Sequence, residues 1–155
     1  MTKILYGDRI GRLGRISTGC SAVIFDDSRQ RILLTRRTDN AQWCLPSGRM
    51  EPGESACETC ERETLEETGL HVQATRLIGI YSNPHQLVEY PDGNRIQLVA
   101  ICFEARVLSG SLTPSDETSE FGWFTTAEID SLDLLPNHKE RIHDAFTPSE
   151  AAYMK

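Results

Sequence analysis

The sequence has no long hydrophobic run. No segment approaches the roughly 18 consecutive apolar residues that a membrane-spanning helix needs, and 39% of its residues are hydrophobic. Residues 1–10 also lack the long apolar stretch and the small-residue cleavage site of a secretory signal. We therefore expect a soluble, cytoplasmic protein that has no membrane partner.

Positive charge is scarce in this chain. It has 16 Lys and Arg residues against 23 Asp and Glu residues, which gives a formal net charge of -7. Binding along a DNA duplex depends on clustered Lys and Arg side chains that neutralise phosphates. A DNA duplex is therefore not an expected partner, and an anionic substrate would need a cation to help it bind.

Neither a disulfide framework nor a second domain is indicated. The five cysteines are an odd number, and three of them lie in strand-like or apolar segments, where a reduced thiol behaves as a small hydrophobic group. A length of 155 residues suits a single hydrophobic core. We therefore expect one domain over residues 1–155, with one active site.

The pattern of apolar and polar residues predicts strands with helices between them. Residues 17–25 and 31–37 are rich in apolar and β-branched residues on either side of a polar turn, which predicts a strand hairpin. The other predicted elements are strands over residues 71–81, 96–107 and 120–125, a short helix from its cap at Thr126 through Ser131, and a helix over residues 138–146 capped by Asn137. The loops at 82–95 and 109–119 are expected to carry substrate selectivity.

The clearest predicted element is a helix over residues 56–68. Ser55 and Glu58 have the spacing of a capping box, in which each side chain accepts a hydrogen bond from the other residue's backbone. The segment contains neither Gly nor Pro, and Gly69 follows it, where helices often end in a left-handed conformation. Residues 43–54, which precede it, contain Gly48, Pro52 and Gly53 and are expected to form a loop.

Three carboxylates share one face of this helix. Glu63, Glu66 and Glu67 stand at positions i, i+3 and i+4, so their side chains converge and repel one another. Mg²⁺ prefers oxygen ligands and is commonly bound through carboxylates together with substrate phosphates. The pattern therefore indicates a site for a cation and a phosphate group. The alternative is a solvated acidic surface, because Glu58 and Glu61 lie on the same helix.

The segment from residue 48 to residue 70 resembles the Nudix box. That motif reads Gly, five residues, Glu, seven residues, Arg-Glu, two residues, Glu-Glu, one residue, Gly and an aliphatic residue. Two positions depart from the family pattern, because Thr64 stands where an aliphatic residue is usual and Ser47 where a glycine often precedes the motif. The matching positions are Gly48, Glu54, Arg62, Glu63, Glu66, Glu67, Gly69 and Leu70.

The resemblance implies an α/β fold, namely an α/β/α sandwich with a mixed β-sheet. It also implies hydrolysis of a nucleoside diphosphate linked to another moiety, with ADP-ribose as the first substrate to test. The alternatives are hydrolysis of a nucleoside triphosphate, a dinucleoside polyphosphate or the 5′ end of an RNA. An inactive nucleotide-sensing module is an alternative of a different class. Family members are often homodimers, which leaves a homodimer open here.

The resemblance also assigns roles to residues of the box. Glu63, Glu66 and Glu67 would bind Mg²⁺, or Mn²⁺ in its place, with the Gly48 carbonyl as a further ligand. Arg62 would orient a neighbouring glutamate, since its planar guanidinium suits carboxylate pairing.

The proton acceptor for the attacking water stays open between Glu63 and an acid in the loop before the late aromatic strand. Glu117 and Glu120 are the candidates for that loop acid. The expected catalytic set is Glu63, Glu66, Arg62 and Glu117.

Candidate substrate contacts also lie outside the box. Arg37 ends a predicted strand near the box, where phosphate binding and solvent exposure both explain it. Tyr81, His85 and Tyr90 lie in or beside the loop at 82–95 and could reach a base or a sugar, although aromatic residues near strands often pack in the core. Glu120 completes this group.

Two further patterns are interpreted as having no chemical role. Cys57 and Cys60 form a CxxC pair at the start of the predicted helix, but no second pair completes a zinc site, and we interpret the pair as incidental. The last predicted helix has a mildly basic face that we interpret as solvent-exposed surface. That face consists of His138, Lys139, Arg141 and His143.

Overall fold

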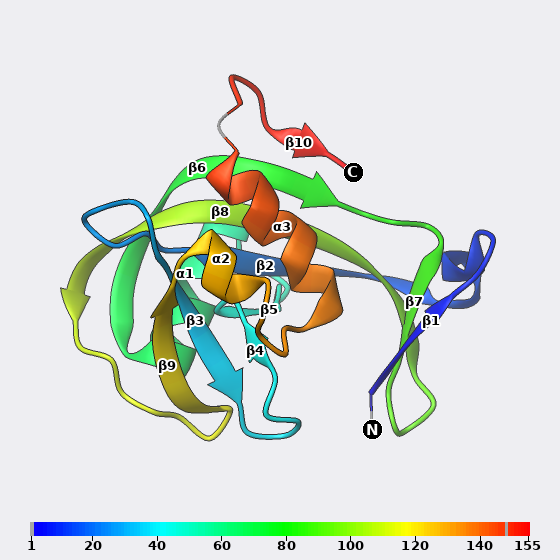
Figure 1. Ribbon diagram of the computed structural model, residues 1–155. Coiled ribbons are helices and arrows are strands. Elements are labelled where there is room, and N and C mark those ends of the chain that lie inside the picture. The colour runs from blue at the N-terminus through cyan, green and yellow to red at the C-terminus, as the bar shows by residue number, and fades with distance from the viewer. Residues whose placement is uncertain (1, 148) are drawn as a thin grey trace.

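The computed structural model describes residues 2–147 and 149–155 of the chain. Figure 1 shows α2 and α3 in front of a large sheet, with α1 behind it and β1 and β7 extending to one side. Among the described helices, none has both the length and the apolar character that crossing a membrane requires. The helices are α1 (Ala56–Thr68), α2 (Thr126–Ile129), α3 (Pro136–Phe146) and the 3-10 helix η1 (Ile10–Leu13).

The larger sheet is mixed. Its long strand β8 pairs in parallel with β2 on one edge and antiparallel with β6 and β7 on the other. β5 extends the sheet beyond β2, β1 extends it beyond β7, and β10 joins β6 in parallel. The strands are β1 (Lys3–Tyr6), β2 (Arg15–Val23), β5 (Ser47–Arg49), β6 (Leu70–Tyr81), β7 (Gln86–Glu89), β8 (Arg95–Gly110) and β10 (Tyr153–Met154).

A smaller antiparallel sheet lies beside the larger one. Its central strand β3 (Ile32–Arg37) pairs with β4 (Trp43–Cys44) on one edge and with β9 (Thr118–Phe124) on the other. The predicted hairpin of residues 17–25 and 31–37 is therefore wrong, because β2 and β3 belong to different sheets. Trp43 also forms a bridge with Leu134, just before α3, and its ring packs edge-on against Phe124 with the ring centroids 4.9 Å apart. The smaller sheet is thereby joined to the segment that leads into α3.

Two hydrophobic cores lie on opposite faces of the sheets. Because side chains alternate along a strand, Ile32 and Leu34 of β3 contact one core while Leu33 contacts the other. The first core contains Ile142 of α3, and the second contains Cys60 of α1. Helices therefore cover both faces, and the predicted α/β/α sandwich with a mixed sheet is confirmed.

The capping box at the start of α1 is confirmed. The Ser55 hydroxyl accepts a hydrogen bond from the Glu58 N–H at 3.2 Å, and the Glu58 carboxylate accepts one from the Ser55 N–H at 2.7 Å. The helix ends at Gly69, whose φ of 79° is left-handed and whose place beside the Ser111 carbonyl leaves no room for a Cβ. These signals give α1 the predicted bounds.

Two predicted helix caps are wrong. The short helix α2 is capped by Thr125, one residue earlier than predicted, because Thr125 and Glu128 form a second capping box. The last helix begins at Pro136, where the missing N–H of proline costs nothing because the first turn of a helix has no acceptor for it. Asn137 therefore lies in the first turn of α3 and does not cap it.

The expected loops at 43–54 and 82–95 are wrong in part, since the first contains β4 and β5 and the second contains one further strand. Residues Gln86–Glu89 form β7, and β7 pairs antiparallel with β1 near the N-terminus. The sequence pattern indicated neither strand, since each has four residues. Their pairing extends the sheet away from the cores and, as described below, builds one wall of a cleft.

Candidate active site

The three glutamates of α1 have different surroundings. Glu67 is only 7% exposed, and its carboxylate accepts a hydrogen bond from the Ser47 N–H at 3.1 Å. Glu63 is partly buried, whereas the side chain of Glu66 is 58% exposed. Helical spacing thus places all three on one face, with Glu67 against strand β5 and Glu66 toward solvent.

Arg62 holds several acceptors of the site together. Its guanidinium donates hydrogen bonds to Glu54 at 3.0 Å, to Glu63 at 2.9 Å and to Glu66 at 3.2 Å. A further hydrogen bond of 3.0 Å reaches the Arg49 carbonyl on β5. The bonds from Arg62 hold the pKa of Glu54 at about 2. The arrangement supports the orienting role that the sequence suggests for Arg62.

Strand β5 brings Gly48 directly against the helix. A Cβ built on Gly48 would overlap the Glu63 carboxylate, so a larger residue would displace that side chain. Gly48 pairs with Cys20 of β2, which fixes its position in the sheet. The missing side chain therefore allows the peptide of residue 48 to lie next to a charged carboxylate.

The acidic side chains are crowded enough to shift their titration. Burial, with the charges of Glu63 and Glu117 adding to it, raises the pKa of Glu67 to about 8 despite the hydrogen bond from Ser47. Burial also raises the pKa of Glu63, against the opposing effect of Arg62. A further positive charge at this place would favour the anionic form of both carboxylates.

The chemistry of these donors fits a hard divalent cation. All of the candidate ligands are oxygen atoms, which Mg²⁺ and Mn²⁺ prefer. Within residues 2–147 and 149–155, however, no group of three His, Cys, Asp or Glu side chains is arranged to hold a metal ion. Glu63 and Glu66 bond to Arg62 instead. Binding of a cation would therefore replace part of this pairing.

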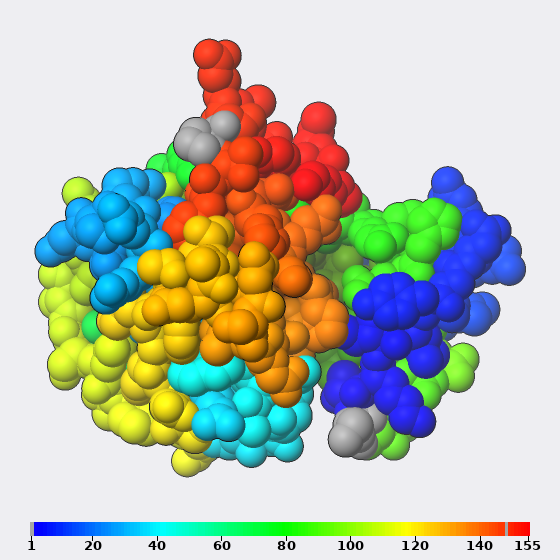
Figure 2. All heavy atoms as spheres, viewed as in Figure 1, coloured from blue at the N-terminus to red at the C-terminus, as the bar shows by residue number. Residues whose placement is uncertain are grey.

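A cleft opens beside the acidic cluster. Its outer part, about 430 Å³, lies between β1 and the segment at the start of α3, and Figure 2 shows this hollow between the blue N-terminal strand and the orange helix. Its inner part, about 170 Å³, reaches Gly48 and shares Arg37, Tyr90, Ile96 and Leu98 with the outer part. We call these two parts the outer cleft and the inner cleft.

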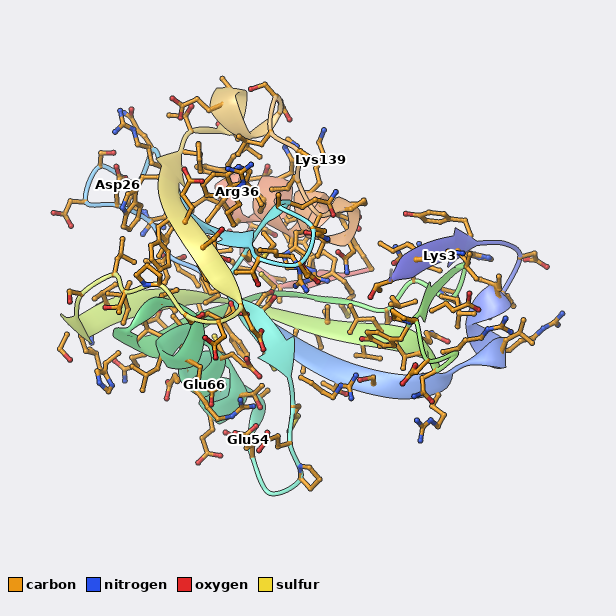
Figure 3. All side chains as sticks on the ribbon, turned by 90° about the horizontal axis from the view of Figure 1, so that it is seen from below. Lys3, Asp26, Arg36, Glu54, Glu66 and Lys139 are labelled. Carbon is orange, nitrogen blue, oxygen red and sulfur yellow. The ribbon has the colours of Figure 1, made fainter. Side chains whose placement is uncertain are left out.

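The site and the cleft use both sides of the larger sheet. In Figure 3 the labelled Glu54 and Glu66 lie below that sheet, on the side of α1, and Lys139 lies above it on α3. Strand β5 is at the boundary, since Ser47 bonds Glu67 while Gly48 also lines the inner cleft. A ligand in the cleft would therefore reach the acidic cluster past this strand.

Comparison with models of known protein families shows the family of this chain. The model of the NUDIX domain matches residues 17–146. The chain belongs to the Nudix family. Enzymes of this family generally use a divalent metal ion and act on small nucleotide substrates.

Relatives of known sequence support this membership. A candidate 8-oxo-dGTP diphosphatase of Bacillus subtilis is 33% identical over 81% of this chain and 77% of its own length. An ADP-ribose pyrophosphatase of Methanocaldococcus jannaschii is 33% identical over 72% of this chain and 63% of its own length. The chain is accordingly a Nudix pyrophosphohydrolase.

Solved structures support the fold. An ADP-ribose pyrophosphatase of Streptococcus suis superposes with a TM-score of 0.67 at 26% identity, over 89% of this chain and 96% of that one. A Nudix hydrolase of Nitrosomonas europaea superposes with a TM-score of 0.73 at 24% identity, over 90% of this chain and 77% of that one. At these identities the likeness mainly supports the sandwich architecture.

The two candidate loop acids lie differently relative to the Nudix box. The charge of Glu117 is close enough to raise the pKa of both Glu63 and Glu67. Glu120 lies on β9, where its exposed carboxylate accepts a hydrogen bond from Arg36 at 2.9 Å. Glu117 is therefore the loop acid that the structure brings to the box, and its catalytic role stays a prediction.

The candidate substrate residues outside the box separate into two groups. Arg37 and Tyr90 line both parts of the cleft, and Arg37 is held there by two hydrogen bonds to Asp39 at 2.9 and 2.8 Å. Tyr81 is 8% exposed, belongs to the first core and donates a hydrogen bond to Asp144 at 2.8 Å. The structure thus favours the packing alternative for Tyr81. The ring of His85 accepts a hydrogen bond from the Arg9 N–H at 3.0 Å and lines neither part of the cleft.

The interpretation of the last helix as a basic surface is wrong at two positions. His138 and Arg141 are each 4% exposed and line the inner cleft. Together with Ile142 and Ala145 they have the i, i+3, i+4, i+7 spacing of one helix face, and all four are buried. That spacing was the available signal, and the polar character of the first two residues concealed it.

The CxxC pair does not form a paired site. Cys57 is exposed, whereas Cys60 is buried, and both are free thiols. Burial raises the pKa of Cys60 far above the ordinary value for a thiol, which leaves it protonated and unreactive at neutral pH. This geometry agrees with the interpretation of the pair as incidental.

Proposed function

We propose that this chain hydrolyses a nucleoside diphosphate linked to another moiety, with Mg²⁺ or Mn²⁺ as its cation and ADP-ribose as the first substrate to test. The observation that carries the proposal is the acidic face of α1 against strand β5, whose Ser47 and Gly48 also line a cleft with room for a nucleotide. An ADP-ribose pyrophosphatase among the relatives, at 33% identity, supports this substrate class.

Glu63, Glu66 and Glu67, with the Gly48 carbonyl, would hold the cation. A bound divalent ion supplies charge neutralisation at the phosphoryl oxygens and lowers the pKa of a bound water. The Ser47 N–H fixes the orientation of the Glu67 carboxylate. Arg62 positions Glu63 and Glu66. Glu67 is thus held by Ser47, whereas Glu63 and Glu66 share Arg62 as their donor.

Proton removal from the attacking water requires a carboxylate near the box. Burial raises the pKa of Glu63, and the neighbouring charge of Glu117 contributes to this shift. We keep Glu63 and Glu117 as the two candidates for the base. Separate Glu63→Gln and Glu117→Gln variants distinguish them, because the base variant loses the acidic limb of the pH–rate profile.

A nucleoside triphosphate is the second candidate substrate. It is favoured by the Bacillus subtilis relative, which is named as a candidate 8-oxo-dGTP diphosphatase and aligns with 81% of this chain. The same site would perform both reactions, since each cleaves a phosphoanhydride. The intact set of Glu63, Glu66 and Glu67 argues against an inactive sensing module. The deciding experiment therefore compares substrates on one enzyme.

The test is a panel of ADP-ribose, other nucleotide sugars and nucleoside triphosphates, assayed for nucleoside monophosphate and phosphate release with Mg²⁺ or Mn²⁺. We expect Glu66→Gln and Glu67→Gln each to lower turnover by about 100-fold or more, because each removes a carboxylate that neutralises charge through the metal. Glu51→Gln is the matched control, since Glu51 is exposed and lies outside the acidic face. Parental turnover in both box variants would contradict the proposed site.

A further inference from the structure

Two basic side chains of α3 form the floor of the inner cleft. His138 and Arg141 are one helical turn apart, and each is 4% exposed. They line the same space of about 170 Å³ as Ser47 and Gly48 of β5. A molecule that extends from the acidic cluster into the cleft would therefore meet these two residues.

Arg141 has no hydrogen-bonding partner in the described part of the chain. Its Nε is buried without an acceptor, and no ion pair to the guanidinium is formed within residues 2–147 and 149–155. Its aromatic neighbour is the ring of Tyr81, whose centroid lies 6.0 Å from the guanidinium carbon. A buried charge without a partner is costly, and such groups are rare unless a ligand or water satisfies them.

Arg37 provides the contrast within the same space. Its guanidinium also lines the inner cleft, but Asp39 accepts two of its hydrogen bonds. The charge of Arg37 is therefore already neutralised by the protein. The charge of Arg141 is not, although burial lowers its pKa below the ordinary value.

His138 offers a second donor. Its Nδ1 accepts a hydrogen bond from the Leu45 N–H at 3.1 Å. Burial, together with the charges of Arg141 and Arg37, lowers the pKa of His138 well below its ordinary value. The imidazole is thus neutral with its proton on Nε2, which leaves the Nε2–H as a hydrogen-bond donor.

The remaining walls of the inner cleft supply no carboxylate. Within the described residues its lining contains no Asp or Glu, although the whole chain has 23 of them. An acceptor atom entering this space therefore meets no negative side chain. One wall is formed by flat or apolar groups, which suit a planar ring: Tyr90, Ile96, Leu98 and Ala100.

We propose that His138 and Arg141 form a specificity site for an oxygen acceptor on the part of the substrate that is not hydrolysed. The proposal rests on the proposed hydrolysis and deepens it. The donors of His138 and Arg141, in a lining without a carboxylate, favour an anionic group or a base with a carbonyl oxygen at the position where adenine and cytosine carry an amino group, C6 of a purine or C4 of a pyrimidine. Among substrates with the same diphosphate linkage, those with a uracil or guanine base are therefore preferred, so ADP-ribose tests the reaction while its uridine and guanosine analogues should bind more tightly.

Binding without metal separates this proposal from the hydrolysis. Titration calorimetry in EDTA with UMP, GMP, AMP, CMP and inorganic phosphate tests the floor directly. For the parent protein we expect UMP and GMP to bind about tenfold more tightly than CMP and AMP, since an unpaired charged donor carries a large penalty. If inorganic phosphate alone binds as tightly, the acceptor that this site prefers is an anionic oxygen rather than a base carbonyl.

Two variants test the residues. Arg141→Met removes the charge at similar volume, and His138→Asn keeps an acceptor near the Leu45 N–H while removing the Nε2 donor. We expect each to weaken binding of the preferred ligand by about tenfold or more. Lys139→Met is the matched control, because Lys139 is exposed on the same helix and loses the same charge. It should leave binding within about twofold, as expected of exposed charges.

Thermal unfolding separates a binding role from a structural one. Arg141→Met should raise the unfolding midpoint of the ligand-free protein, because it removes a buried charge that has no partner. A lowered midpoint would overturn the proposal, since it would mean that the guanidinium stabilises the fold. Unchanged nucleotide binding in Arg141→Met would overturn it as well. If no substrate of the panel is hydrolysed, the proposed function fails, and the binding result stands separately.

Discussion

At the scale of single residues, a buried histidine makes this protein sensitive to acid. The pKa of His138 lies well below its ordinary value because of burial and of nearby Arg141 and Arg37, whereas an unfolded chain takes up the proton near pH 6.5. Below that pH the unfolded state binds more protons, so stability is lost as the pH falls. A single proton gives at most about 1.4 kcal/mol per pH unit.

The measurement is the free energy of unfolding from pH 7.5 to 5.0 without metal. Glu67 acts in the opposite direction, because its raised pKa of about 8 gives stability that is lost as the pH rises. Subtracting the free energy of unfolding of His138→Asn from that of the parent cancels the contribution of Glu67. We expect that difference to shrink as the pH falls, and His71→Asn, which changes an exposed histidine, should leave the parental slope. A constant difference for His138→Asn would refute this prediction.

The sequence predicted the residues of the box because their spacing along one helix is a local property. Glu63, Glu66 and Glu67 share a face whatever the rest of the chain does. The burial of Glu67 was not predictable, since it depends on the Ser47 N–H of a strand that approaches from elsewhere. The floor of the cleft was missed for a related reason. Arg141 is polar, and only the packing of α3 shows that it points inward.

At the scale of elements, α1 depends on its first turn. The Ser55 hydroxyl accepts a hydrogen bond from the Glu58 N–H, and the Glu58 carboxylate accepts one from the Ser55 N–H. We expect Ser55→Ala to lower the free energy of unfolding by about 1 kcal/mol, the usual cost of a lost N-cap. Ser55→Asp keeps an acceptor at the cap and should stay near the parental value. Urea denaturation measures both, and equal midpoints for the two variants would contradict the role of the cap.

Elements were predictable where their signals lie within one segment. The bounds of α1 follow from Ser55, Glu58 and Gly69, which are all adjacent to it in sequence. The short strands β1, β4, β5, β7 and β10 were not predicted, because each has only two to four residues and is defined by its pairing with another strand. Proline at the start of α3 likewise overrode the Asn137 cap. Short, non-local elements are therefore the part of this fold that sequence patterns leave out.

At the scale of the whole molecule, the acidic side chains of the Nudix box and the basic side chains of the inner cleft lie in separate places. The net charge is -7, yet the inner cleft is lined by Arg37, Arg49, His138 and Arg141 and by no described carboxylate. The acidic cluster lies across strand β5 from that cleft, since Gly48 lines the cleft and also lies against the Glu63 carboxylate. A substrate carrying a diphosphate would thus be held by a cation at one end and by hydrogen-bond donors along the other.

The outer cleft depends on the N-terminal strand. Residues of β1 line it through Ile4 and Tyr6, but none of them belongs to either core. The NUDIX match, residues 17–146, also begins after β1. We therefore expect deletion of residues 1–7 to raise the KM of the best substrate about fivefold or more, the loss of roughly 1 kcal/mol of apolar contact. The acidic cluster is unaffected, so kcat should stay within about twofold.

Deletion of residues 150–155 is the matched control for this truncation. It removes β10, another short edge strand, which lines neither part of the cleft. Both truncated proteins should lose some thermal stability, because each leaves a sheet edge unpaired. Only the N-terminal truncation should raise KM. An unchanged KM in that variant would mean that substrate does not reach the outer cleft, and equal increases in both would mean that the effect comes from a loosened fold rather than from a lost wall.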